Sequence, residues 1–183
     1  TKRGDEPPTP HEQYAAGADE TVTMNNLMCS FVPRVTLLRT SQPLEIKNSD
    51  EVGHNTKIAS QYHPINPLIA PNNALTDDEF SQAERVPAKV TCNIHPWMTG
   101  WLVVQNTPYM AVTNEKGEFM IENVPAGKHK FQVWHEKTNY LQEVKVGGKS
   151  TKWSRGQVEV IIKDGETYDL GEVTVDYSTL SGS

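Results

Sequence analysis

From residue 22 onward, the sequence consists of short runs of alternating apolar and polar residues, separated by turn-forming residues. Side chains on a strand point alternately to its two faces, so such runs predict half-buried β-strands. Clear examples stand at 35–38, 44–47, 89–92 and 101–104. Many short strands with frequent turns are typical of a sandwich or barrel, and no segment shows a convincing helical period. The sequence therefore predicts an all-β fold.

The length of 183 residues allows one large or two small domains, and 36% hydrophobic residues suffice for packed cores. Residues 1–20 are rich in Pro, Glu and Asp without apolar periodicity, which predicts a flexible acidic arm. We expect one domain over 21–105, a second over 106–178 and a tail over 179–183. The proline-rich stretch 60–87 is predicted to be a long loop between sheets.

Charge and hydropathy exclude some classes of partner. The chain has 17 basic and 23 acidic residues, and no cluster of Lys or Arg that would follow a phosphate backbone, so nucleic acid is not an expected partner. No apolar run approaches the ~20 residues of a membrane span. The first residues include neither Met nor an apolar signal segment. We expect a signal peptide to have been removed and the protein to be periplasmic or extracellular.

The segment 92–98 carries the most chemical information. A thiol (Cys92), an imidazole (His95) and a thioether (Met98) follow directly after an apolar strand, and His54 lies just past an earlier strand. Soft sulfur ligands with imidazole suit copper, and one Cys, two His and a weak axial Met form a blue-copper electron-transfer centre. Any one of these residues, taken singly, is more often an ordinary core or surface residue than a metal ligand. The order and spacing of all four favour a metal site.

This pattern resembles the cupredoxin family. The likeness rests on Asn48-x-Asp50, the pair His54-Asn55 and the later Cys-x-x-His-x-x-Met loop, which is most similar to that of the amicyanin-like and plastocyanin-like members. A Phe-x-Pro turn at 31–33 matches the one that opens the second cupredoxin strand. The resemblance covers about residues 22–105 and implies a Greek-key β-sandwich.

The resemblance also implies the roles of the site residues. His54, Cys92 and His95 would be equatorial ligands of one copper ion, Met98 would be the axial ligand, and the carbonyl of Gly53 would lie near the metal. His95 would be the electron port. The apolar docking patch around it would consist of Pro96 and Trp97, with Met28 and Phe31, although Trp97 would serve equally as core filling.

The other cysteine of the chain, Cys29, departs from the simple blue-copper pattern. It precedes the Phe-x-Pro turn, which in a cupredoxin lies at the copper end. Three interpretations stay open: a buried thiol near the site, a disulfide with Cys92 that would disable the site, or a second thiolate ligand. A zinc tetrahedron of Cys29, His54, Cys92 and His95 is a further alternative.

The second half of the chain resembles the carboxypeptidase regulatory-like, transthyretin-like β-sandwich family. The likeness rests on the motifs at 113–121 and 123–127 and runs over about residues 99–176. Strands are expected at 117–121 and 131–134. This resemblance implies a second sandwich packed against the first, and it says little about chemistry. His135, beside a carboxylate, is a candidate additional metal ligand, with an exposed histidine at a strand end as the simpler alternative.

A carrier is expected rather than an enzyme. Copper enzymes of this type need a second copper site built from His-x-His pairs, and the sequence contains none; it also lacks a Gly-x-Ser-x-Gly nucleophile motif. The expected function is extracytoplasmic electron transfer, with a cytochrome, a dehydrogenase or a larger complex as partner. The alternatives are a structural or interaction subunit of a larger assembly, or a module for copper storage or delivery.

Overall fold

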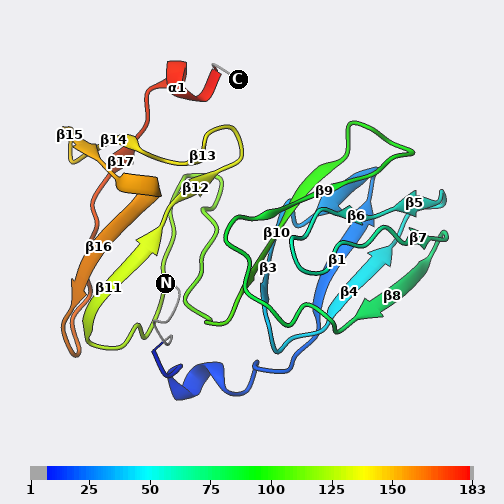
Figure 1. The fold of residues 1–183 in the computed structure, drawn as a ribbon, viewed down its shortest axis with the longest axis horizontal. Coiled ribbons are helices and arrows are strands. Elements are labelled where there is room, and N and C mark those ends of the chain that lie inside the picture. Colours follow the sequence, from blue (N-terminus) through cyan, green and yellow to red (C-terminus); the bar gives the residue numbers. More distant parts are fainter. Residues whose placement is uncertain (1–7, 182–183) are drawn as a thin grey trace. The chain divides into compact units, whose positions relative to one another are not determined.

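Figure 1 shows the computed structural model of the chain, which describes residues 8–181. The chain is almost entirely β, as the alternating sequence pattern predicts. It forms two compact units that divide between Asn123 and Val124. The arm expected over 1–20 and the tail expected over 179–183 lie partly outside the described residues, and the domain boundary expected at 105/106 stays a prediction.

The first unit contains two four-stranded sheets, in the orders β2-β1-β4-β8 and β3-β10-β9-β6. The strands of the first sheet are β1 (Val22–Leu27), β2 (Ser30–Val32), β4 (Leu44–Asn48) and β8 (Asn73–Asp77). Those of the second are β3 (Val35–Arg39), β6 (Lys57–Ile58), β9 (Ala88–Thr91) and β10 (Thr99–Gln105). Strand β1 runs parallel to β4 and β3 runs parallel to β10, while the other neighbours are antiparallel. A small additional sheet pairs β5 (His54–Asn55) with β7 (Leu68–Ile69).

Alternate residues of these strands fill one hydrophobic core. Strand β10, for example, buries every second side chain over its length. Fully buried core residues come from both sheets: Met24, Leu38, Leu44, Ile46, Val90, Leu102 and Val104. Burial of each such side chain contributes about 1.5–3 kcal/mol, so the core is a stable frame for the loops at its ends.

The stretch 60–87 contains strands that the sequence analysis did not predict. Strand β8 pairs antiparallel with β4, from Leu44 opposite Asp77 to Asn48 opposite Asn73. Its side chains are nearly all exposed, so it lacks the alternation that marks a half-buried strand. Strand β8 therefore forms because it pairs with the edge of β4, and the sequence pattern of β8 does not predict it.

The described part of the expected arm contacts the first unit. It includes the 3₁₀ helix η1 (Glu12–Tyr14). The Tyr14 ring packs edge-on against Tyr109 at a centroid distance of 5.5 Å, and its hydroxyl donates a hydrogen bond to the carbonyl of Glu122. The guanidinium of Arg39 donates to the carbonyl of Tyr14. These contacts hold residues near η1 in place.

The second unit is built from three small sheets and its own core. The sheets pair β11 (Gly127–Gln132) with β16 (Gln157–Ile162), β12 (Trp134–His135) with β13 (Asn139–Tyr140), and β14 (Glu143–Val146) with β15 (Lys149–Lys152) and β17 (Val173–Thr174). The remaining elements are η2 (Ser154–Gly156) and the five-residue helix α1 (Tyr177–Ser181). The buried core consists of Leu141, Val144, Trp153, Val158 and Val160.

Residues 117–121, which the sequence analysis predicted to be a strand, do not form one in the structure. The Asn114 side-chain carbonyl accepts hydrogen bonds from the backbone N–H groups of Lys116 and Glu118, which stabilises a turn. The following apolar residues Phe119 and Met120 are 52% and 72% exposed. The local turn thus outweighs the strand propensity of the segment, because no neighbouring strand pairs with it.

Candidate metal site

The predicted ligands come together because strand pairing joins the ends of their loop. Cys92 directly follows β9 and Met98 directly precedes β10, and the pairing of Thr91 with Thr99 brings these two positions side by side. His54 begins β5, and β6, a short distance further along the chain, pairs with β9. Residues far apart in the sequence therefore reach one end of the sandwich.

Three nitrogen and sulfur donors converge at this end. The Sγ of Cys92 lies 4.0 Å from Nδ1 of His54 and 3.7 Å from Nδ1 of His95. The two imidazole centroids are 4.5 Å apart. Cys92 and His54 are buried and His95 is half-buried. A metal bound at ordinary metal–sulfur and metal–nitrogen distances would separate such atoms by roughly 3.6–3.8 Å, so one ion fits this set after small shifts.

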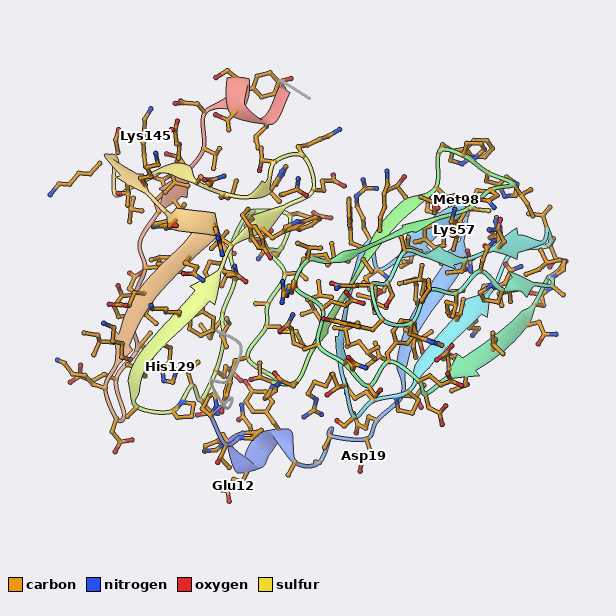
Figure 2. All side chains as sticks on the ribbon, in the orientation of Figure 1. Glu12, Asp19, Lys57, Met98, His129 and Lys145 are labelled. Carbon is orange, nitrogen blue, oxygen red and sulfur yellow. The ribbon has the colours of Figure 1, made fainter. Side chains whose placement is uncertain are left out.

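Met98 lies beside this group in the chain and is 1% exposed, within the same hydrophobic cluster as Cys92. Its backbone N–H donates a hydrogen bond to the carbonyl of His95 at 2.9 Å, which closes the ligand loop as a tight turn. Figure 2 labels Met98 at the end of the sandwich where β9 and β10 are joined. Its role as the axial ligand stays a prediction.

Asn55 organises the ligand loop. Its side-chain oxygen accepts hydrogen bonds from the backbone N–H of Asn93 at 2.7 Å and of Ile94 at 3.3 Å, and from the Cys92 thiol at 3.4 Å. Its amide nitrogen donates to the side-chain oxygen of Asn66. From the sequence, Asn55 is recognisable only as part of the His54-Asn55 motif. Its hydrogen bonds to the ligand loop arise only in the folded protein, because the loop is far away in the sequence.

Asp50 fixes the orientation of His54. One carboxylate oxygen lies 2.8 Å from Nε2 of His54 and also accepts the N–H of Cys29, while the other accepts the N–H of Met28 at 2.7 Å. A carboxylate only accepts, so Nε2 carries the proton and the Nδ1 lone pair of His54 faces Cys92. Burial raises the pKa of Asp50, but the hydrogen bonds from Cys29, Met28 and His54 outweigh it, so the pKa falls below its ordinary value.

The substitution Asp50→Asn tests this orientation. An amide can present its nitrogen to Nε2 and so no longer selects the tautomer that leaves Nδ1 free. Changes of this kind next to a metal-binding histidine typically cost about 10–100-fold in metal affinity. We expect a loss of that size in copper affinity, measured by competition with a chelator. The neighbouring exposed Glu51→Gln is the matched control, and an equal loss in both variants would contradict the assignment.

Cys29 lies close to the site but in a separate group of donors. Both cysteines are free thiols, so the structure does not contain the disulfide that was one interpretation of Cys29. Within the described residues, the His, Cys, Asp and Glu donors that approach within 4.8 Å of one another form two groups, one of His54, Cys92 and His95 and one of Cys29, Asp50 and His54. The four-residue zinc tetrahedron considered from the sequence is not one of them.

The apolar patch expected around His95 is only partly as predicted. Trp97 is 68% exposed with its ring 5.2 Å from that of His95, Met28 is 84% exposed, and Pro96 is also exposed. Phe31, in contrast, is 3% exposed and packs close to Gly100 inside the core. The assignment of Phe31 to the surface patch is therefore wrong. It is wrong because Phe31 faces inward on β2.

Two further candidates differ in their surroundings. Gly53 is half-buried and immediately precedes His54, as the resemblance requires, and the approach of its carbonyl to a metal stays a prediction. His135 lies on β12 of the second unit, where its Nδ1 accepts a hydrogen bond from the N–H of Lys137. It belongs to neither donor group found in the described residues.

Comparisons with known proteins give matches only among solved structures. No family model and no curated protein matches the sequence. Amicyanin from Paracoccus versutus is 15% identical with a TM-score of 0.40, over 46% of this chain and 81% of that chain. A reduced amicyanin variant is 17% identical with a TM-score of 0.42, over 48% and 85%.

A copper-containing nitrite reductase from Thermus scotoductus is 21% identical with a TM-score of 0.42. That match covers 46% of this chain and 22% of the reductase, so this chain spans about a fifth of that enzyme. The cupredoxins, which the sequence motif resembles, are thus represented among the structural neighbours over about half of the chain. Within residues 8–181, no helix is long and apolar enough to cross a membrane.

Proposed function

We propose that the first unit binds one copper ion through His54, Cys92 and His95, with Met98 as a weaker axial ligand, and that the protein transfers electrons outside the cytoplasm. The observation that carries this proposal is the convergence of one thiol and two imidazole nitrogens at 3.7 and 4.0 Å. Copper in such a donor set supplies a one-electron couple. Zinc binds similar donors but has no redox chemistry.

Rigid support of the ligands favours electron transfer. Asn55 holds the backbone next to Cys92, Asp50 holds the far side of the His54 ring, and both Cys92 and His54 are buried. Ligands held in this way keep nearly the same positions when the charge of the site changes. The ligands then need little reorganisation when the copper changes oxidation state, and electron transfer is faster.

The exposed apolar surface near His95 is the proposed docking patch. Its members are Trp97, Pro96 and Met28, to which we add Ile94, 52% exposed in the ligand loop. Apolar and aromatic side chains of this kind are enriched where proteins meet. We propose a redox protein, such as a cytochrome or a dehydrogenase, as the partner.

A carrier is proposed rather than an enzyme because the donor set is complete. Catalytic metal sites keep an open position for water or substrate, whereas one thiolate, two imidazoles and a thioether occupy four positions. Cys92 and His54 are both buried, which limits contact of these two ligands with solvent. The site is therefore suited to exchange of electrons and not to binding of a substrate.

The second unit is proposed to be a structural or interaction module of the carboxypeptidase regulatory-like, transthyretin-like kind. Among the described residues, neither donor group takes a member from this unit. Its core is separate and consists of apolar side chains. This favours a scaffolding role for it, and a place for the whole protein in a larger assembly is the alternative function.

Titration of the purified protein with Cu(II) tests the proposal. We expect one equivalent to produce an intense visible band and a thiolate-copper electron paramagnetic resonance spectrum, and we expect ascorbate to bleach the band reversibly over repeated cycles. Release of the ion on reduction would instead support storage or delivery. A protein that stays colourless with copper would contradict an electron-transfer role.

A further inference from the structure

A second group of metal-binding donors lies on the other side of His54. It consists of the thiol of Cys29, the carboxylate of Asp50 and the imidazole of His54, with ligand atoms all within 4.8 Å of one another. Cys29 and Asp50 are half-buried, and His54 is fully buried. Thiol, carboxylate and imidazole are all donors that zinc accepts in proteins. The group is compact enough to surround one ion.

His54 connects the two groups through its two ring nitrogens. Its Nδ1 faces Cys92 at 4.0 Å, whereas its Nε2 faces Asp50 at 2.8 Å. A neutral imidazole has one lone pair available for a metal, because the other nitrogen carries the proton. The two groups therefore compete for His54: an ion on Nε2 places the ring proton on Nδ1 and removes that nitrogen from the first site.

The turn between β1 and β2 presents Cys29 to this group. Met28 and Cys29 have φ values of 52° and 51°, in the left-handed region that residues with a side chain seldom occupy. Asp50 stabilises this conformation by accepting both N–H groups. Backbone strain of this kind persists where surrounding contacts enforce it, and it is concentrated at functional sites. The thiol is thus held near His54 at some conformational cost.

We propose that Cys29, Asp50 and His54 form a second metal site that takes a borderline divalent ion such as Zn²⁺ and competes with copper for His54. Zinc accepts thiolate, carboxylate and imidazole together, and three protein ligands leave its fourth position for water. The half-buried setting of Cys29 and Asp50 lets water reach that position. This inference deepens the proposed function, since it rests on His54 being a ligand of the first site.

Binding at this site requires a small movement. The 2.8 Å between Nε2 and the Asp50 oxygen is a hydrogen-bond distance. Two ligands of a tetrahedral zinc ion are roughly 3.3 Å apart, given zinc–ligand distances near 2 Å. The carboxylate must therefore withdraw by about half an ångström. The turn at Met28 and Cys29 would move with it, because both N–H groups are bonded to the same carboxylate.

The Cys92→Ser variant isolates the second site, because Cys29 is then the only thiol in the chain. We expect Zn²⁺ to slow alkylation of Cys29 by iodoacetamide by about tenfold or more once the ion is well above its dissociation constant. We also expect one equivalent of Cd²⁺ to produce a thiolate-to-metal ultraviolet band that is absent from the double variant with Cys29→Ser. An alkylation rate that is the same with and without Zn²⁺ would overturn the proposal.

A competition experiment provides a test that does not depend on the Cys92 variant folding. In the otherwise unaltered protein, Zn²⁺ is expected to lower the apparent copper affinity, and Cys29→Ser is expected to reduce that effect to the part caused by direct competition of Zn²⁺ for the first site. Equal sensitivity to Zn²⁺ in both proteins would contradict the shared role of His54. The copper-dependent visible band of the unaltered protein reports separately on the first site. If the unaltered protein shows no such band while Zn²⁺ still protects Cys29 in Cys92→Ser, the proposed function is refuted and the second site stands.

Discussion

Replacing Cys92 with Ser is expected to abolish the visible band of the copper-loaded protein. The thiol lies 3.7 and 4.0 Å from the two imidazole nitrogens, and its sulfur is a soft donor that suits copper. A serine hydroxyl is a hard donor that stays protonated at neutral pH and gives no intense thiolate transition. Replacing a residue that only contacts a ligand lowers metal affinity by up to about 100-fold, and the loss of the ligand itself should be larger. Absorption spectra and chelator competition measure both effects.

The matched control for this experiment is Cys29→Ser. Cys29 belongs to the other donor group, so the blue band should survive its replacement. The fold of Cys92→Ser should be preserved, because the side-chain oxygen of Asn55 accepts from the present thiol and would equally accept from a hydroxyl. A band that persists without Cys92, or disappears without Cys29, would show that the thiolate ligand has been assigned to the wrong residue.

Replacing Asn48 with Ala is expected to lower the free energy of unfolding by about 3 kcal/mol, because buried groups lose their hydrogen-bond partner. Asn48 is fully buried. Its amide nitrogen donates to the carbonyls of Val52, Ile69 and Ala70 at 2.8, 3.1 and 3.1 Å, and its side-chain oxygen accepts the N–H of Asp50 at 3.0 Å. Alanine provides neither group, and water cannot fully replace them in the interior.

Urea unfolding would measure this loss as a lower transition midpoint with an unchanged slope. Copper affinity should fall as well, because the loop held by Asn48 carries Asp50, which orients His54. The matched control is Asn106→Ala, since Asn106 is exposed and its replacement should change stability by about 0.5 kcal/mol or less. Equal midpoints for the two variants would contradict the structural role of Asn48.

Local patterns explain why the all-β fold and the donor group were predictable. Alternation of apolar residues marks β3, β9 and β10, whose buried faces build the core. Cys92 and His95 are close in sequence, and a short loop between paired strands has few ways to separate its ends. His54 was found through the motif that accompanies it, and the structure brings it to Cys92.

Features that depend on a partner distant in the sequence were not predictable. Strand β8 exists because β4 offers it an edge, and its exposed residues carry no periodic signal. The burial of Phe31 depends on its close approach to Gly100 on another strand. The segment 117–121 carries the composition of a strand without a neighbour that would pair with it.

The sequence by itself determined the kind of fold and the identity of the donors, since alternation and residue chemistry are properties of short segments. Only the tertiary structure decided how the side chains that carry those donors are oriented. Asp50 reaches across to the turn at Cys29 and to the far nitrogen of His54, and Asn55 reaches the backbone beside Cys92. Hydrogen bonds of this kind require particular distances and angles between segments, and folding of the sandwich creates them.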